Sequence, residues 1–157
     1  MYGLHRYGLQ MYGKILVVED SLINQRALSW QLEHLGLSCD IVSTGAASLA
    51  ALKIRRYEAV LMDMHLPDME GCQAATLIRQ AGFTLPIIAL TADDTSKSAQ
   101  KCFDAGMNEY LCKSLESTAL EAALRRWLPA ARQSKLEKHT SAESEGLVSG
   151  TEFDAFS

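Results

Sequence analysis

The chain has 157 residues, of which 48% are hydrophobic, and its formal net charge at pH 7 is −4. This length allows one domain of ordinary size with some additional tail, and the hydrophobic share is enough for a single core. No block of like charge indicates a nucleic-acid surface, and the longest apolar runs are too short to cross a bilayer. We therefore expect a cytoplasmic domain that is not itself in the membrane and does not bind nucleic acid directly.

The two ends of the chain differ in composition from its middle. Residues 1–13 contain repeated Tyr-Gly pairs without the features of a signal peptide, so we interpret them as a leader or a cloning remnant. Residues 129–157 are rich in Ser, Glu, Lys and Thr, which is typical of a linker or the start of a further domain. Residues 14–128 are expected to fold. The cysteines lack CxxC spacing, and we expect reduced thiols at all four: Cys39, Cys72, Cys102 and Cys112.

Strand-like and helix-like segments alternate along residues 14–128. Short apolar runs predict strands at residues 14–18, 39–42, 59–62, 85–90 and 109–112. Amphipathic or Ala/Leu-rich segments predict the helices that follow them, at 22–35, 45–56, 69–81, 95–105 and 117–128. This alternation favours an α/β fold with a parallel, doubly wound sheet and right-handed crossovers.

Individual residues add detail to these helices. Ser21 can cap the first one, and four apolar positions are expected on its buried face: Leu22, Leu28, Leu32 and Leu35. We expect Asp93 and Asp94 to cap the helix that begins near residue 95. Trp30 and Trp127 are most simply core or interface anchors.

Polar side chains stand at the ends of four expected strands. In chain order they are Glu19 and Asp20, Asp63, Thr91 and Lys113. Because the carboxyl ends of parallel strands meet at one edge of a sheet, we expect these side chains to gather there. Packed carboxylates repel unless a cation neutralises them, and hard oxygen ligands with room for water fit Mg²⁺. The sequence therefore predicts a magnesium site at Glu19, Asp20 and Asp63.

The same constellation predicts phosphoryl chemistry. Lys113 supplies a mobile charge suited to a phosphoryl group, and Thr91 supplies a hydroxyl donor for one of its oxygens. The group left to accept the phosphoryl group is the carboxylate of Asp63, acting as a covalent nucleophile. An isolated aspartate at a strand end is usually a turn former, so the acid pair and Lys113 in register are what favour catalysis.

Four segments resemble motifs of the receiver (response-regulator) domain in order and spacing: residues 17–20, 61–71, 90–92 and 110–113. The resemblance covers residues 14–128. It implies a flavodoxin-like fold with strand order 2-1-3-4-5 and five helices. It also implies a two-component phosphorelay, in which Asp63 takes a phosphoryl group from a phosphohistidine with Mg²⁺ as cofactor.

The resemblance further implies how the metal is held. Asp20 and Asp63 would bind it, Glu19 would do so mainly through water, and the main-chain carbonyl of His65 would complete the protein ligands. The side chain of His65 is expected to face solvent. Together with Asp93, it could influence how water reaches the acyl phosphate.

Signal output is implied in the same way. Thr91 and Tyr110 would be switch residues: Thr91 moves toward the phosphoryl group, and the ring of Tyr110 turns inward behind it. Lys113 would pair with the phosphoryl oxygens. The domain would catalyse its own phosphorylation and slow dephosphorylation, and its output would be a changed face formed by residues 95–105, 109–112 and 117–128.

Two segments refine the subtype, since residues 20–24 and 105–110 resemble receivers fused to hybrid sensor histidine kinases. This implies a histidine kinase domain or a histidine phosphotransfer domain as partner, a parent protein that could be membrane-anchored, and a monomer or weak dimer. Ser114 departs from the family, which usually has a proline after the lysine, often through a cis peptide bond. The loop after Lys113 is therefore where the switching behaviour of this chain could differ.

Two other functions remain open at this point. A pseudo-receiver would use the same fold for docking without phosphorylation, and the intact acidic cluster with Thr91 and Lys113 argues against it. A haloacid-dehalogenase-like phosphatase also uses an aspartate nucleophile, but it would need a second aspartate two residues later, where this chain has His65.

Overall fold

The structure is a computed structural model that describes residues 11–92, 95–113 and 117–129. In these residues the strands are β1 (Lys14–Val18), β2 (Ser38–Val42), β3 (Ala59–Asp63), β4 (Ile87–Thr91) and β5 (Glu109–Cys112). The helices are α2 (Leu22–His34), α3 (Gly45–Ile54), α4 (Gly71–Gln80), α5 (Ser96–Asp104) and α6 (Ser117–Trp127). All the strands pair in parallel in the order β2-β1-β3-β4-β5, which confirms the flavodoxin-like fold.

Some expectations fall outside the described residues. Asp93, Asp94, the loop at Ser114 and the tail from residue 130 onward belong to this group. The prediction that Asp93 and Asp94 cap the helix is nevertheless corrected, because the N-cap of α5 is Thr95, whose hydroxyl accepts a hydrogen bond from the backbone N–H of Ser98 at 3.2 Å. Among the described helices, none is long and apolar enough to cross a membrane. All four cysteines are free thiols.

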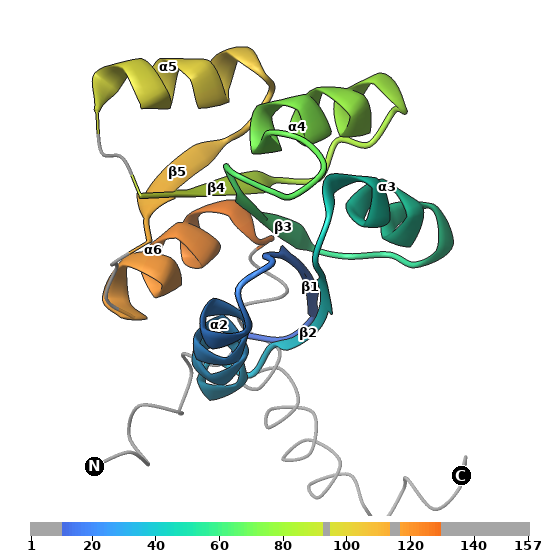
Figure 1. Ribbon diagram of the computed structural model, residues 1–157. Helices are drawn as coiled ribbons and strands as arrows, with labels where there is room; N and C mark the ends of the chain where they lie inside the picture. Colours follow the sequence, from blue (N-terminus) through green and yellow to red (C-terminus); the bar gives the residue numbers. More distant parts are fainter. Residues whose placement is uncertain (1–10, 93–94, 114–116, 130–157) are drawn as a thin grey trace, which may run out of the picture.

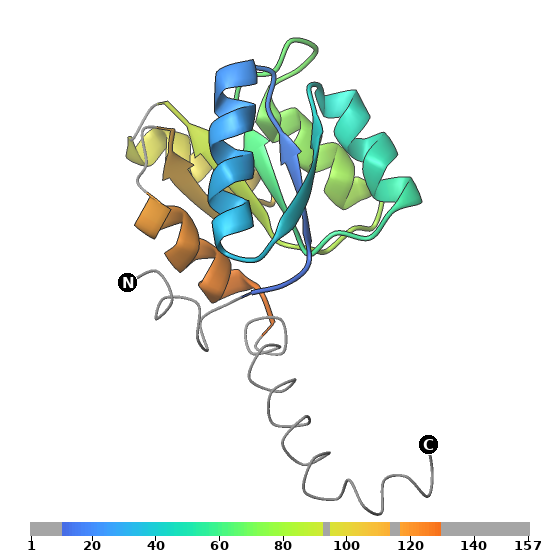
Figure 2. The same cartoon turned by 90° about the horizontal axis from the view of Figure 1, so that it is seen from below.

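Helices cover both faces of the sheet. Since successive side chains of a strand point to opposite faces, each strand packs against both layers of helices. In β1, Ile15 and Val17 pack in the cluster that faces α2 and α6, whereas Leu16 and Val18 pack in the cluster that faces α3, α4 and α5. Figures 1 and 2 show these two layers of helices on either side of the sheet. Burial on both faces explains why the central strands read as continuous apolar runs.

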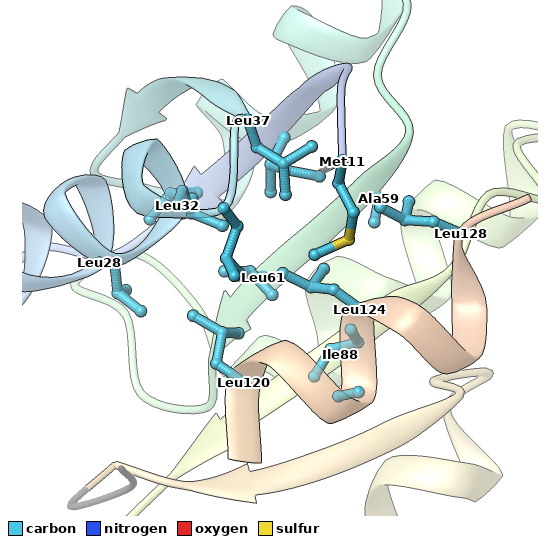
Figure 3. Packing of buried hydrophobic residues seen from close by; sticks show 14 of the residues in the cluster. Met11, Leu28, Leu32, Leu37, Ala59, Leu61, Ile88, Leu120, Leu124 and Leu128 are labelled. Atoms are coloured by element: carbon cyan, nitrogen blue, oxygen red, sulfur yellow. The ribbon is translucent and has the colours of Figure 1, made fainter. Parts of the chain in front are cut away.

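The cluster under α2 and α6 reaches beyond the expected start of the domain. Met11 is 1% exposed and lies among the leucines of this cluster in Figure 3. Its backbone N–H donates a hydrogen bond to the carbonyl of Leu35 at 2.9 Å. The division of the chain at residue 13 stays a prediction, but Met11 contributes to the core.

Helix α2 corrects the expectation for Leu22 and narrows the one for Trp30. Leu28, Leu32 and Leu35 are buried as expected, but Leu22 is 61% exposed. At 3.6 residues per turn, Leu22 lies roughly 120° around the helix from Leu28, so it falls outside the stripe that meets the sheet. Trp30 is 58% exposed and is therefore not a core residue, and its alternative role as an interface anchor stays a prediction.

Element boundaries shift by one or two residues from the predicted ones. Helix α4 begins at Gly71 rather than residue 69, because Glu70 forms a capping box with Gln73. The side chain of Gln73 accepts a hydrogen bond from the backbone N–H of Glu70 at 3.1 Å. Strand β4 begins at Ile87, directly after Pro86, which has no N–H to donate to the ladder.

Candidate functional site

The strand order places the acidic residues at one edge of the sheet. β1 and β3 are neighbours, and the chain winds outward from them in both directions, so a crevice forms at their carboxyl ends. Glu19 and Asp20 follow β1, and Asp63 is the last residue of β3. Thr91 ends β4, and Lys113 follows β5. The structure therefore brings together the residues that the sequence singled out.

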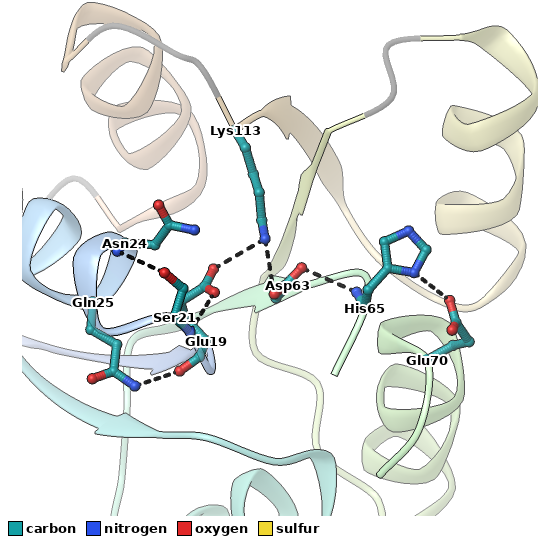
Figure 4. A network of polar contacts seen from close by, with 8 residues as sticks. All are labelled: Glu19, Ser21, Asn24, Gln25, Asp63, His65, Glu70 and Lys113. Atoms are coloured by element: carbon teal, nitrogen blue, oxygen red, sulfur yellow. Dashed lines mark hydrogen bonds and ion pairs between the residues drawn. The ribbon is translucent and has the colours of Figure 1, made fainter. Parts of the chain in front are cut away.

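Asp63 has a buried carboxylate with a partner on each oxygen. The residue is 1% exposed. Its Oδ1 accepts a hydrogen bond from the backbone N–H of His65 at 3.1 Å, and its Oδ2 lies 2.9 Å from Nζ of Lys113 (Figure 4). The amide and the ammonium group fix the carboxylate at the mouth of the crevice.

Glu19 is equally buried, at 1% exposure, but only one of its oxygens has a hydrogen bond. Oε2 accepts from the backbone N–H of Ser21 at 3.0 Å, whereas Oε1 has no hydrogen-bond partner and lies 3.4 Å from Nζ of Lys113. Burial, the largest effect, raises the pKa of the Glu19 carboxyl above its ordinary value, although the hydrogen bond from Ser21 opposes the rise. A buried oxygen without a donor is a ready ligand for a cation.

The geometry fits a magnesium ion. Glu19, Asp20 and Asp63 each offer one carboxylate oxygen, and these atoms lie within 4.8 Å of one another. Asp20 is exposed while the other two residues are buried, so a bound ion would face protein on one side and water on the other. Mg²⁺ suits such a place because it prefers oxygen ligands and retains several waters.

Lys113 supplies the positive charge within the crevice. Burial by itself lowers the pKa of its ammonium group, but the hydrogen bond and charge of Asp63, with the charge of Glu19, raise it overall. The backbone N–H of Lys113 donates to the carbonyl of Thr91 at 2.6 Å, which ties its position to the end of β4. Its side chain is 27% exposed, so it can also meet a ligand that enters from solvent.

The remaining predicted residues surround this centre. Thr91 is 2% exposed at the end of β4. Tyr110 is half-buried in β5, and its ring meets the edge of Phe103 with centroids 6.3 Å apart. The side chain of His65 is 73% exposed, as expected, and its Nδ1 lies 3.0 Å from a carboxylate oxygen of Glu70. The switch roles and the metal contact of the His65 carbonyl stay predictions.

Sequence reasoning did not single out the residues that hold the loops of the site. A Cβ on Gly71 would collide with the main-chain oxygen of Asp63 and come within 2.9 Å of Cα of Met64. The carboxylate of Asp68 accepts hydrogen bonds from the first two backbone N–H groups of α3, at 2.9 and 3.0 Å. The amide of Gln25 donates to the carbonyl of Glu19 at 2.6 Å. The sequence signals for two of these residues are a glycine near the start of an expected helix, Gly71, and an acidic residue directly after a proline, Asp68.

A sequence profile of the response regulator receiver domain matches residues 15–125. The chain belongs to the response regulator receiver family. Its relatives include sensor histidine kinases, among them the hybrid signal transduction histidine kinase L of Dictyostelium discoideum, and also the transcriptional regulatory protein BasR of Escherichia coli K12. It is 35% identical over 121 residues to the sensor histidine kinase RcsC of Escherichia coli K12, a match covering 77% of this chain and 13% of RcsC. This receiver therefore spans about one eighth of the length of that relative.

Solved receiver structures resemble the whole fold. The receiver domain of the sensor histidine kinase PA1611 from Pseudomonas aeruginosa PAO1 is 38% identical, with a TM-score of 0.68 over 73% of this chain and 96% of that one. That structure has a magnesium ion coordinated in its active-site cleft. The receiver of Ssk1 from Saccharomyces cerevisiae, crystallised with the histidine phosphotransfer protein Ypd1, is 28% identical with a TM-score of 0.71, over 79% of this chain and 93% of that one.

Proposed function

We propose that this receiver takes a phosphoryl group from a phosphohistidine onto the carboxylate of Asp63. The observation that carries the proposal is the position of this carboxylate, buried at the crevice and 2.9 Å from Nζ of Lys113 beside two further acids. A carboxylate fixed in this way can attack phosphorus with little reorganisation, because Lys113 already holds it in place and supplies a positive charge for the phosphoryl oxygens.

The transfer step balances simply. An oxygen of Asp63 forms a bond to phosphorus while the phosphorus–nitrogen bond breaks, and its electron pair goes to the imidazole, which takes up a proton. Lys113 pairs with a phosphoryl oxygen, and the hydroxyl of Thr91 donates to another. Mg²⁺ would be held by Glu19, Asp20, Asp63 and the main-chain carbonyl of His65, and would neutralise phosphoryl oxygens when bound. Slow attack by water on the acyl phosphate would reset the domain.

Phosphorylation would change the conformation of a face that lies next to the crevice. The contact of Thr91 with the phosphoryl group draws it inward, and the half-buried ring of Tyr110 follows into the space behind it. Both residues lie on adjacent strands, β4 and β5, which link the crevice to α5 and α6. A partner would read the changed face of α5, β5 and α6.

The partner that supplies or removes the phosphoryl group would carry an exposed histidine. We infer a histidine kinase domain or a histidine phosphotransfer domain, and several relatives support this inference because they are sensor histidine kinases. The complex of Ssk1 with Ypd1 is a further precedent among receivers.

The test is intact-mass spectrometry after incubation with acetyl phosphate and Mg²⁺. We expect one added phosphoryl group that is labile to hydroxylamine, requires Mg²⁺ and is absent from Asp63→Asn. Asp104→Asn is a matched control, since Asp104 is exposed on α5 and bonds only the side chain of Gln100 among the described residues. A phosphorylated histidine phosphotransfer protein should then replace acetyl phosphate as the donor.

Two results would contradict the proposal. If Asp63→Asn were phosphorylated as fully as the wild type, the acceptor would be another residue. If the wild type accepted no phosphoryl group from either donor and bound neither Mg²⁺ nor beryllofluoride, the non-phosphorylated docking module would explain the fold better.

A further inference from the structure

A second cavity lies at the edge of the sheet opposite to Asp63. It has a volume of about 280 Å³ and is lined by the end of α3, by the segment that connects α3 to β3, and by the turn between α4 and β4. Tyr57 precedes β3 and Leu85 precedes β4, so the cavity opens at the amino ends of these strands. Asp63 stands at the carboxyl end of β3. Figures 1 and 2 both show the turns that leave α3 and α4 on the same side of the molecule.

Part of the wall of this cavity is apolar or aromatic and is held in place. Leu52 is 6% exposed, and Tyr57, Phe83 and Leu85 are partly buried against the same core cluster. The phenol of Tyr57 donates a hydrogen bond at 2.6 Å to Oδ2 of Asp40. Arg79 binds the carbonyls of Phe83 and Leu85 at 3.0 and 2.8 Å, which fixes the turn. A ligand would meet a preformed site and would not need to order it.

Two arginines give the cavity a positive side. Arg55 lies 3.6 Å from the carboxylate of Asp40, which is already shared with Lys14 at 3.2 Å. Arg56 has no ion-pair partner in the part of the chain that the structure describes. Among the described residues that line the cavity, there is no aspartate or glutamate. Asp40 partly neutralises Arg55, so the guanidinium group of Arg56, beside aromatic rings, is the one that favours an anion.

We propose that this cavity binds a small organic anion that carries one aromatic ring and one carboxylate or phosphate group. The volume of about 280 Å³ lies at the lower end of the range for ligand pockets, which suits one ring better than a dinucleotide. Tyr57 and Phe83 offer aromatic contacts to the ring, while the planar guanidinium of Arg56 can bind the anionic group with two hydrogen bonds. The receiver would thus have a ligand site separate from its phosphorylation site.

The proposal is tested by titrating the 157-residue chain with phenyl phosphate and with benzoate, and by following amide resonances in ¹⁵N NMR spectra without Mg²⁺. We expect saturable shifts at residues 52–57 and 82–85, unchanged in Asp63→Asn. Inorganic phosphate and benzyl alcohol, which each carry half of the proposed chemistry, should bind at least about tenfold more weakly. Arg56→Gln should weaken binding about tenfold, as expected for the loss of a charge-assisted contact.

Lys53→Gln is the matched control, because it removes the same charge from an exposed position of α3 that does not line the cavity. Its affinity should equal that of the wild type. The proposal is overturned if neither probe gives saturable shifts below about 10 mM. It is also overturned if Arg56→Gln and Lys53→Gln weaken binding equally, since net charge alone would then explain the association.

Discussion

The ammonium group of Lys113 lies 2.9 Å from Oδ2 of Asp63 and pairs this carboxylate with a positive charge in a nearly closed environment. The same nitrogen lies 3.4 Å from Oε1 of Glu19. With Asp20, the crevice holds three acids and one base, so an excess of negative charge remains when all are ionised. A divalent cation would balance this excess, and an incoming phosphoryl group would then meet two cations instead of repelling carboxylates.

Removing Mg²⁺ should therefore lower the stability of the domain. At a Mg²⁺ concentration about 100 times its dissociation constant, binding should add about 2.7 kcal/mol to the free energy of unfolding. Urea denaturation with Mg²⁺ and with EDTA measures this difference. Glu19→Gln should reduce it, whereas Asp104→Asn, which carries the same kind of change on the exposed surface of α5, should keep it. Equal stability of the wild type in both solutions would contradict a magnesium site.

Replacing Lys113 by Gln should separate its two roles. Without the ammonium group, Asp63 and Glu19 lie buried with no counter-charge, and the free energy of unfolding in EDTA should fall by about 1 to 3 kcal/mol, since partial exposure of Lys113 reduces the effect. Phosphorylation by acetyl phosphate should slow at least about tenfold, because one phosphoryl contact is lost.

The matched control is Lys101→Gln. Lys101 is an exposed residue of α5 without an ion-pair partner among the described residues. Mg²⁺ should restore more stability to Lys113→Gln than it adds to Lys101→Gln, since the metal replaces the missing charge only in the crevice. If Mg²⁺ stabilises both variants to the same extent, Lys113 does not neutralise the metal-binding acids.

The centre of the site was predictable because its residues sit where regular structure ends. An apolar run that stops at Asp63 or Glu19 marks a strand and its carboxyl end together, and parallel pairing then brings these ends to one edge. The boundary of α4 was less predictable, since both Met69 and Gly71 fit the helical period. Only the capping box of Glu70 decides between them.

Other features depend on contacts between segments far apart in the sequence. Trp30 is of a residue type common in cores, but it lies on a face of α2 where 58% of its surface is exposed. Asp68 holds the start of α3 from a distance of more than 20 residues along the chain. The cavity beside Arg56 arises from two turns that no local pattern relates. Such contacts follow from the packing of whole elements and leave little local signal.

Gly71→Ala should damage both the fold and the chemistry. The added Cβ would collide with the backbone oxygen of Asp63, and because backbone cannot move aside as a flexible side chain can, the end of β3 must shift. We expect a loss of about 2 to 3 kcal/mol in the free energy of unfolding. Phosphorylation should slow more than tenfold, since small displacements of a reacting group are costly.

Gly82→Ala provides the comparison for this glycine. Gly82 has a φ of +97°, but a Cβ there would meet nothing within 4 Å. It should cost about 1 kcal/mol through backbone strain alone and leave the phosphorylation rate unchanged. If the two alanine variants phosphorylated at the same rate, the close approach of Gly71 to Asp63 would have no catalytic consequence.

A hydrogen bond far from the crevice should make stability depend on pH in the alkaline range. The phenol of Tyr57 donates to Oδ2 of Asp40 at 2.6 Å, and burial, followed by this bond, raises the pKa of Tyr57 from 10.0 to about 12. Between these values the folded state holds a proton that the unfolded state releases. Stability should therefore be fully present below pH 10 and fall as the pH rises toward 12, by at most about 1.4 kcal/mol per pH unit.

Tyr57→Phe removes the titrating group and isolates its contribution. Urea denaturation at several pH values should show a shallower alkaline decline than in the wild type, at a cost of about 1 kcal/mol at neutral pH for the lost hydrogen bond.

The hydrogen bond from Tyr57 also acts on Asp40, where it is the largest effect and lowers the pKa of the carboxyl. Asp40 therefore stabilises the fold above pH 3.8 and loses this effect as the pH falls further. In a plot of the free energy of unfolding against pH, Asp40→Asn should flatten both the acid and the alkaline decline. Tyr57→Phe should flatten the alkaline decline and weaken the acid one. Identical alkaline slopes in the wild type and Tyr57→Phe would show that this bond does not control the titration.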